Sequence, residues 1–171
     1  MTVLDQQTYP GIVQPGIDEP AAYKLARLAA HYDGFDFLEA IRTGELPPPP
    51  VGELLGFTIR DVAPGSVTFV MTPEEKHYNP IGMVHGGVTA TLLDSAMGCA
   101  LQSVLPAGTG YSTLDISVRY LRPITARTGP VVATGTLVHK GRRTATAEAR
   151  LVDEAVGQVL ATATSTLLVL S

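Results

Sequence analysis

The sequence predicts an α+β domain in which a curved antiparallel sheet wraps around one long central helix, with an N-terminal helical arm before it. The helix is predicted at residues 87–104, a proline-free stretch rich in Ala, Leu and Met whose surface is apolar or small nearly all round. Such a helix is typically buried on every side. Segments with strand patterns lie before and after it and are joined by short connections, which favours antiparallel pairing.

The arm precedes a proline-rich stretch. Residues 1–18 mix Gly, Pro and polar residues without periodicity, which indicates a loose segment. Apolar residues then recur at three- and four-residue spacing over 19–43, with a break midway, and predict two short helices. The prolines of 47–50 predict an extended linker, because they supply no backbone donors. We therefore expect an arm over residues 1–50 and one main domain over residues 51–171.

The main domain begins with two predicted strands, 54–62 and 66–72, around a turn that contains Pro64 and Gly65. The strand predicted at 113–120 has the clearest pattern. Apolar residues alternate there with polar ones, as in a strand with one buried face. The apolar positions are Leu114, Ile116, Val118 and Tyr120.

Further strands are predicted at 130–138, 144–152 and 158–169, joined by short turns. In the second of these, three alanines share one face and are small enough to let the central helix lie close. They are Ala145, Ala147 and Ala149.

Length and charge limit the possible functions. The chain has 171 residues, enough for one core of ordinary size, and a formal charge of −4, which argues against a broad nucleic-acid surface. The single cysteine, Cys99, cannot form an internal disulfide, and no signal-peptide pattern is present. Apolar stretches end well before the roughly 20 residues that span a membrane. We expect a soluble cytoplasmic protein that binds neither nucleic acid nor membrane.

Asp94 is the one charged residue between Gly86 and Val104, inside the predicted buried helix. Burying a carboxylate without partners is costly, so its placement calls for an explanation. It could lie at an exposed edge of the helix or form a salt bridge with Arg119 or Arg122. Alternatively, a partly desolvated carboxylate suits a general base or a nucleophile.

The predicted helix begins with His85-Gly86-Gly87. Glycines at a helix start leave backbone N–H groups uncovered, and these groups together with the helix dipole can bind a developing oxyanion, although a plain glycine turn would give the same tripeptide. Gly86 and Asp94 are eight residues apart, which is roughly 12 Å along a helix, too far for both to act on one carbonyl. If both act on one substrate, they come from different subunits, which predicts a symmetric dimer with two sites.

An ordered set of motifs resembles the hotdog-fold thioesterases of the phenylacetate-degradation type. The resemblance covers about residues 51–171, the whole main domain. The motifs are Asn79-x-x-Gly82-x-x-His85-Gly86-Gly87, then Leu93-Asp94, then Thr113-Leu114-Asp115 and Tyr120-Leu121-Arg122-Pro123.

The resemblance implies a hotdog fold and hydrolysis of an acyl-CoA to a free acid and CoA. Asp94 is then the general base or nucleophile, and the Gly86 amide of the neighbouring subunit polarises the thioester carbonyl. Asn79 and His85 place the thioester and order the loop, which includes the substrate-binding glycines Gly82 and Gly87. The hydroxyl of Thr113, where relatives often have Ser, helps to hold water. The resemblance also implies a homodimer, commonly paired into a tetramer, without metal or separate cofactor, since CoA is part of the substrate.

Four basic residues are candidates for binding the phosphates of the CoA nucleotide, because they lie at predicted strand ends or in a turn. A Lys-Gly-Arg-Arg turn is equally compatible with a solvated hairpin tip. The four residues are Arg122, Lys140, Arg142 and Arg143.

Two other functions stay open. A hotdog-fold hydratase or dehydratase would also use a His and a carboxylate across an interface, and a non-catalytic acyl-CoA-binding domain would need no Asp94. His31, His77 and His139 lack the close spacing of a zinc site, and Cys99 is interpreted as a small core residue rather than a nucleophile. With no Trp in the chain, aliphatic and aromatic acyl groups are both compatible with the sequence.

Overall fold

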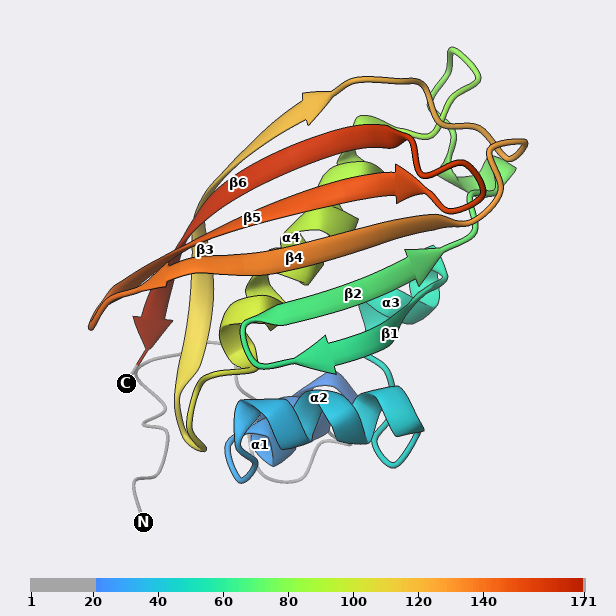
Figure 1. Ribbon diagram of the computed structural model, residues 1–171. Helices are drawn as coiled ribbons and strands as arrows, with labels where there is room; N and C mark the ends of the chain where they lie inside the picture. The colour runs from blue at the N-terminus through green and yellow to red at the C-terminus, as the bar shows by residue number, and fades with distance from the viewer. Residues whose placement is uncertain (1–20, 171) are drawn as a thin grey trace.

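The computed structural model describes residues 21–170 and contains a six-stranded antiparallel sheet curved around a long helix (Figure 1). The loose segment predicted at 1–18 lies outside the described residues. The elements in chain order are α1 (Ala21–Ala29), α2 (Gly34–Thr43), α3 (Pro50–Leu55), β1 (Phe57–Ala63), β2 (Ser66–Met71), a short 3-10 turn η1 (Glu75–His77), α4 (Gly86–Gln102), β3 (Gly110–Tyr120), β4 (Val131–Lys140), β5 (Thr144–Asp153) and β6 (Val159–Leu170).

Helix α4 is the centre of the core, which confirms the predicted architecture. The strands follow the order β1-β2-β4-β5-β6-β3, and each neighbouring pair is antiparallel. Leu92, Leu93, Met97 and Leu101 of α4 are completely buried against the inner face of the sheet. The other side of α4 is only half-buried and carries polar residues, among them Thr91, Asp94 and Ser95.

Small residues let α4 approach the sheet closely. The predicted alanines of β5, Ala145, Ala147 and Ala149, are buried beneath it. The closest approach is at Gly135 of β4, where a Cβ atom would lie 2.2 Å from the carbonyl oxygen of Ala96. No side chain fits in that space, so Gly135 is required by the packing of helix on sheet.

Strand β3 differs from its predicted pattern. Its pairing with β6 contains a bulge at Leu114, because Thr113 pairs with Leu167 and Asp115 with Thr166. The bulge turns Thr113 to the inner face, and Leu114 is 56% exposed, so the prediction of a uniform alternation was wrong there. β3 is also an edge strand, and its apolar residues Ile116 and Tyr120 are 37% and 55% exposed, because no further strand covers them.

The N-terminal helices pack on the β1 side of the sheet (Figure 1). The N–H of Gly34 donates to the carbonyl of Leu105, and Asp33 accepts from the N–H of Ala107, so α2 is tied to the segment that follows α4. The division at residue 50 stays a prediction. Pro50 begins α3, because a proline suits the first turn of a helix. The strand predicted to start at residue 54 therefore starts later, at Phe57 of β1, and the prediction was wrong for the residues before it.

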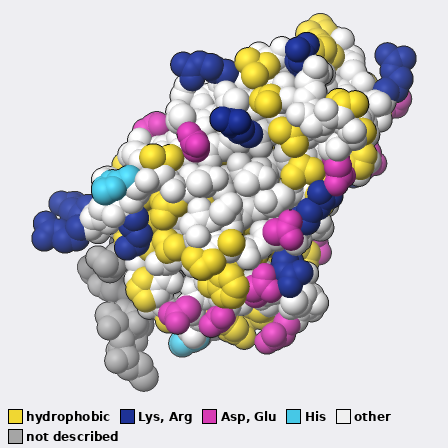
Figure 2. All heavy atoms as spheres, viewed as in Figure 1, with side chains coloured by type: hydrophobic (Ala, Val, Ile, Leu, Met, Phe, Trp, Pro, Cys, Tyr) yellow, Lys and Arg dark blue, Asp and Glu magenta, His cyan; other side chains and the backbone are white. Residues whose placement is uncertain are grey.

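The outer face of the sheet carries many threonines and is uncovered. Its centre is mostly white in Figure 2, where neither charged nor hydrophobic groups predominate. Outward positions on β5 and β6 include Thr146, Thr164 and Thr166. Within residues 21–170, no helix is long and apolar enough to cross a membrane.

Candidate active site

The loop before α4 is fixed at several points, which positions the start of the helix. The N–H of His85 donates to the carbonyl of His77 at 2.8 Å, and the N–H of Val84 donates to Ile124 at 2.9 Å. Tyr78 and Val84 form an isolated antiparallel bridge. Hydrogen bonds thus join the two ends of the loop before α4 and attach the loop to the segment after β3.

Asn79 organises this loop from within. Its Oδ1 atom accepts hydrogen bonds from the N–H groups of Ile81 and Met83, at 3.1 and 3.2 Å. Its carbonyl oxygen accepts from the N–H of Gly82, which lies at φ +82°, a conformation suited to glycine. The Nδ2 amide of Asn79 has no protein acceptor among the described residues, so it can donate to a ligand.

His85 is the N-cap of α4. Its Nδ1 atom accepts a hydrogen bond from the N–H of Gly87 at 2.9 Å. A ring nitrogen that accepts carries no proton, so the proton of the neutral imidazole is on Nε2. His85 thus fixes the first turn of the helix and presents an N–H donor on its exposed side.

The N–H of Gly86 has no acceptor in the described part of the chain, unlike those of its neighbours. The carbonyl of His85, in the same peptide group, accepts from the N–H groups of Val88 and Thr89 at 3.0 and 3.4 Å. Such bonds polarise the peptide and strengthen its own N–H as a donor. Gly86 therefore offers a free N–H at the positive end of a 17-residue helix, which suits an oxyanion.

Tyr120 lies directly against Gly86. Its hydroxyl donates a hydrogen bond to the carbonyl oxygen of Gly86 at 2.9 Å, and a Cβ on Gly86 would lie 3.1 Å from the phenol ring carbon Cζ. The sequence places Tyr120 in the strand pattern and in the motif Tyr120-Leu121-Arg122-Pro123, and neither predicts a role for its hydroxyl. The alternation of β3 could not have shown this contact, because it joins residues 34 positions apart.

A pocket of about 470 Å³ opens beside the Gly86 amide. Its wall is mostly apolar, with a small number of polar groups, which is the usual composition of a small-molecule site. The polar and functional residues in its lining are Asn79, Gly86, Thr89, Tyr120 and Arg122.

Asp94 lies two helical turns further along α4 and is half-buried. Its Oδ1 atom accepts a hydrogen bond from the hydroxyl of Thr113 at 2.9 Å. Among the described residues, no ion pair involves Asp94, so the alternative of a salt bridge with Arg119 or Arg122 was wrong. The Asp94 carboxylate therefore keeps its second oxygen available for chemistry.

Tyr111 and Cys99 are partly buried near Asp94, on its C-terminal side along α4. The ring of Tyr111 lies on Gly98, where a Cβ would be 2.6 Å from a ring carbon. Burial, and to a lesser extent the neighbouring Cys99 and the charge of Asp94, raises the pKa of Tyr111 well above its usual value. Burial also raises the pKa of the Cys99 thiol to about 12. Cys99 is therefore a poor nucleophile, as its interpretation as a core residue predicts.

Gly86 lies at the start of α4 and Asp94 near its middle, so they contact different parts of β3. Gly86 is bonded to Tyr120 and Asp94 to Thr113, at opposite ends of the inner face of β3. Within one chain, therefore, the Gly86 amide and the Asp94 carboxylate are not brought together.

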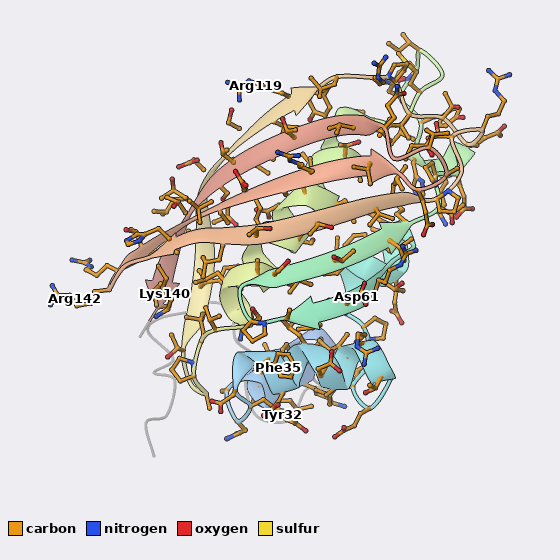
Figure 3. All side chains as sticks on the ribbon, in the orientation of Figure 1. Tyr32, Phe35, Asp61, Arg119, Lys140 and Arg142 are labelled. Atoms are coloured by element: carbon orange, nitrogen blue, oxygen red, sulfur yellow. The ribbon has the colours of Figure 1, made fainter. Side chains whose placement is uncertain are left out.

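The four basic candidates divide between these ends. Arg122 lines the pocket beside Gly86, whereas Lys140 and Arg142 lie on the β4–β5 hairpin at the other end of the sheet (Figure 3). The backbone N–H of Arg122 donates to the carbonyl of Leu160 near the start of β6, and the backbone carbonyl of Arg143 accepts from the N–H of Val169 near its end. The strand between these two points is roughly 30 Å long at 3.3 Å per residue, so the two arginines lie far apart. The structure does not bring all four together within one chain.

His77 is the histidine that sequence reasoning left least explained. It is only 2% exposed, and its Nδ1 accepts from the N–H of Glu74 at 3.0 Å. Its Nε2 atom is buried and has no hydrogen-bond partner among the residues that the structure describes. Across residues 21–170, no group of three or more His, Cys, Asp or Glu side chains is placed to hold a metal ion.

Comparison with known proteins places the chain in a family. A model of the thioesterase superfamily matches residues 81–160. Human acyl-coenzyme A thioesterase 13 is 35% identical over 105 residues, which cover 61% of this chain and 73% of the relative. A 1,4-dihydroxy-2-naphthoyl-CoA hydrolase of Listeria monocytogenes is 30% identical over 103 residues, 60% of this chain and 81% of that protein.

Solved structures agree with these sequence relatives. A phenylacetic acid degradation-related protein of Ralstonia eutropha superposes with a TM-score of 0.69 at 30% identity, covering 77% of this chain and 98% of that one. The phenylacetic acid degradation protein PaaI of Thermus thermophilus, as an N33D mutant, superposes with a TM-score of 0.63 at 32% identity, covering 70% and 97%. The resemblance seen in the sequence motifs is thereby confirmed, and this chain belongs to the thioesterase superfamily of hotdog-fold enzymes.

Proposed function

We propose that the protein hydrolyses an acyl-CoA thioester, with each active site built from two subunits. The Gly86 N–H of one subunit binds the thioester carbonyl oxygen, and Asp94 of the partner subunit supplies the carboxylate. Water adds to the carbonyl carbon overall, the C–S bond breaks, and a free acid and CoA thiol leave. The acyl-CoA substrate is supported by the relatives named as acyl-CoA thioesterase and naphthoyl-CoA hydrolase.

The observation that carries the proposal is the free N–H of Gly86 beside a pocket. The neighbouring N–H of Gly87 is used by His85, so the helix start leaves this donor at the pocket wall. Hydrogen-bond donors fixed in advance lower the energy of a tetrahedral intermediate, because they need no reorganisation when the negative charge develops. Asn79 and the Nε2–H of His85 are further donors on the same loop, where they would orient the thioester.

The carboxylate half-site supports the same reaction. Thr113 holds one oxygen of Asp94, which leaves the other oxygen for water or for the carbonyl carbon. Because Asp94 follows Gly86 by roughly 12 Å along the same helix, the proposal requires the two groups to come from different chains. The exposed edge of β3, with its uncovered Ile116 and Tyr120, is the natural surface for a second copy. Pairing of two dimers into a tetramer stays a prediction, which sedimentation velocity measures.

The test is release of free thiol from a panel of acyl-CoAs by the wild-type protein and Asp94→Asn. The panel contains short and long aliphatic, phenylacetyl and hydroxybenzoyl thioesters. The variant keeps the shape of the side chain and removes its charge, so we expect kcat to fall by about 10²- to 10⁴-fold with the fold intact. Hydrolysis that proceeds undiminished in Asp94→Asn would rule out the assigned role. Ligand binding without any thiol release would instead favour a hydratase or a non-catalytic binding domain.

Asp94 acts either as general base or as nucleophile, and isotope labelling distinguishes these routes. In a single turnover in H₂¹⁸O with excess enzyme, a general base gives an acid labelled in the first turnover. A nucleophile forms an acyl-enzyme anhydride, and attack of water on its Asp94 carbonyl places the label in the protein, so labelled Asp94 identifies the nucleophilic route. Mass spectrometry of product and protein reads both outcomes.

The basic residues have a testable place in this arrangement. A composite site would bring Arg122 of one subunit and the β4–β5 hairpin of the other to the same side of the interface, since each accompanies one half-site. Arg142→Ala and Arg143→Ala are then expected to raise KM for acyl-CoA while leaving KM for an acyl-pantetheine unchanged, because the shorter substrate lacks the nucleotide phosphates. Equal KM changes for both substrates would contradict a phosphate-binding role.

A further inference from the structure

The side chain of Tyr111 fills the space between β3 and α4 on the C-terminal side of Asp94. Tyr111 and Thr113 are alternate residues of β3 before its bulge, and both are half-buried on its inner face. On α4, Gly98 follows Asp94 by one helical turn. The aromatic ring lies directly on Gly98, where an added Cβ would be 2.6 Å from one ring carbon and 2.8 Å from another. The ring therefore reaches from the strand to the backbone of the helix.

Helix and strand agree on how far the ring lies from the carboxylate. The four residues from Asp94 to Gly98 rise about 6 Å along the helix, and the two residues from Thr113 to Tyr111 span about 7 Å of strand. The reference point for both is the 2.9 Å hydrogen bond from the Thr113 hydroxyl to Asp94. Tyr111 thus stands one helical turn beyond the carboxylate. Burial raises the pKa of its hydroxyl, so this end of the ring is largely removed from water.

The N-terminal helices hold the segment that leads into Tyr111. The N–H of Gly34 donates to the carbonyl of Leu105 at 2.9 Å, and Oδ1 of Asp33 accepts from the N–H of Ala107 at 2.9 Å. In Figure 1 the connection between α4 and β3 lies beside these helices. The start of β3 is therefore fixed from two sides, by its pairing with β6 and by the helical arm.

An acyl-CoA extends in two directions from its thioester carbonyl, and the two ends of α4 suit different parts of it. The CoA part must lead to solvent, because its nucleotide phosphates are charged and costly to bury. Towards its start α4 becomes exposed, at His85 and Gly87, so that direction leads to solvent. In the other direction the Tyr111 ring ends the space beside Asp94. Only the apolar acyl group gains free energy from burial there.

We propose that Tyr111 limits the length of the acyl group, so that the preferred substrates are short-chain acyl-CoAs. This inference rests on the proposed hydrolysis and names its substrate class. A short acyl group lies beside α4 between Asp94 and the ring, whereas a long one meets the ring. The ring is packed on helix backbone and cannot retreat without cost. A long chain therefore holds its carbonyl carbon away from Asp94, and a displacement of about 1 Å can lower the rate about 100-fold.

The wild-type protein gives the first test, which needs no variant. Thiol release is measured with acetyl-, butyryl-, hexanoyl-, octanoyl- and palmitoyl-CoA, each below the concentration at which it forms micelles. We expect kcat/KM to fall about 100-fold or more between butyryl- and octanoyl-CoA. A kcat/KM that is equal for both, or that rises with chain length, overturns the inference.

Removing the ring tests the residue itself. Tyr111→Val keeps a β-branched residue that suits a strand, and it opens the space over Gly98. We expect the ratio of kcat/KM for octanoyl-CoA to that for butyryl-CoA to rise at least about tenfold, since each newly buried methylene group contributes about fourfold. Tyr111→Phe is the matched control, because it keeps the ring, and its ratio is expected to stay within about twofold of wild type. An unchanged ratio in folded Tyr111→Val, or an equal rise in Tyr111→Phe, overturns the inference.

Two further measurements separate the possible failures. Melting curves check folding, and Tyr111→Leu, which keeps more apolar volume, replaces Tyr111→Val if that variant does not fold. The ratio is expected to rise about threefold or more in Tyr111→Leu, and no rise in it counts against the inference in the same way. Thiol release from butyryl-CoA by Asp94→Asn is measured in the same assay. Release that depends on Asp94 but not on chain length contradicts only the role of Tyr111, whereas no release from any thioester contradicts the proposed hydrolysis itself.

Discussion

The hydroxyl of Tyr120 donates a 2.9 Å hydrogen bond to the carbonyl oxygen of Gly86, so the edge strand of the sheet holds the first turn of the central helix. The phenol ring also lies so close to Gly86 that an added Cβ would sit 3.1 Å from it. The hydrogen bond acts on the peptide that carries the N–H of Gly87, which His85 caps. Tyr120 and His85 therefore fix the same turn from two sides, and the Gly86 N–H is left free between them.

Removing this hydroxyl is expected to reduce turnover more than substrate binding. In Tyr120→Phe the ring stays and one hydrogen bond of about 1 kcal/mol is lost, so we expect kcat to fall about three- to tenfold with KM nearly unchanged. Steady-state kinetics with the best acyl-CoA of the panel measures the split, and a melting curve within about 3 °C of wild type is the control for folding. An unchanged kcat would show that Tyr120 does not position Gly86.

Thr113 is expected to act through its hydroxyl rather than its shape. Thr113→Ser keeps the donor to Asp94, and we expect activity within about threefold of wild type. Thr113→Val removes the donor at nearly equal volume, and the loss of a bond to a charged group, about 1.5–3 kcal/mol, predicts a fall in kcat of about 10- to 100-fold. Comparable activity of the Ser and Val variants would contradict a role for the hydrogen bond.

Gly135 is expected to be the least tolerant position of the sheet. A methyl group there would meet the backbone of Ala96 at 2.2 Å, so the helix would have to move away from β4. Gly135→Ala should lower the free energy of unfolding by about 2 kcal/mol or more, measured by urea denaturation. Thr136→Ala is the matched control, because Thr136 is the next residue on β4 and is exposed. Equal stability of both variants would contradict the close packing of α4 on β4.

Cys99 is expected to react slowly in the native protein. Its pKa of about 12 leaves about one thiolate in ten thousand at pH 8, because burial disfavours the charged form. Alkylation by iodoacetamide should therefore be slow in buffer and fast in urea, and should become faster as pH rises towards 12. Cys99→Ala should retain thioester hydrolysis that depends on Asp94. Rapid alkylation in buffer at pH 8, or loss of activity in Cys99→Ala, would contradict a passive core role.

The sequence was sufficient for most of the fold because the largest elements have unambiguous patterns. A long apolar stretch without proline predicted the central helix, and the alanines of β5 indicated where that helix lies close. Two local features were not predictable. Helix α3 was missed, and its last two residues, 54–55, were assigned to the first strand, since this short apolar run has no clear period. The bulge at Leu114 depends on how two strands pair. Gly135 was also missed, because a glycine in a strand does not reveal what lies above it.

Candidate site residues could be predicted from the sequence where their type is unusual among the neighbouring residues. Asp94 is a carboxylate in a buried helix, and Gly86 is a glycine at a helix start, so both could be chosen from the sequence. The contact of Tyr120 with Gly86 could not be predicted from the sequence, because it depends on the tertiary fold and the ring of Tyr120 fitted the apolar alternation of β3. The separation of Arg122 from the β4–β5 hairpin also required the strand order.

Mixing two inactive variants tests whether the active site is shared by two subunits. Gly86→Pro removes the N–H and keeps the helix start, because proline suits the first helical position and His85 before it is extended at φ −60°, ψ 134°. Gly86→Ala, which retains the N–H, is the matched control for crowding against Tyr120 and should keep more activity. The partner variant is Asp94→Asn.

The measurement is thiol release after Gly86→Pro and Asp94→Asn are unfolded together in equal amounts and refolded. Random pairing gives half heterodimers, each with one intact site, so we expect recovery of about a quarter of wild-type activity. Native mass spectrometry of the mixture counts the heterodimers. Heterodimers that form at the expected level but release no more thiol than either parent variant would contradict a site built from two chains.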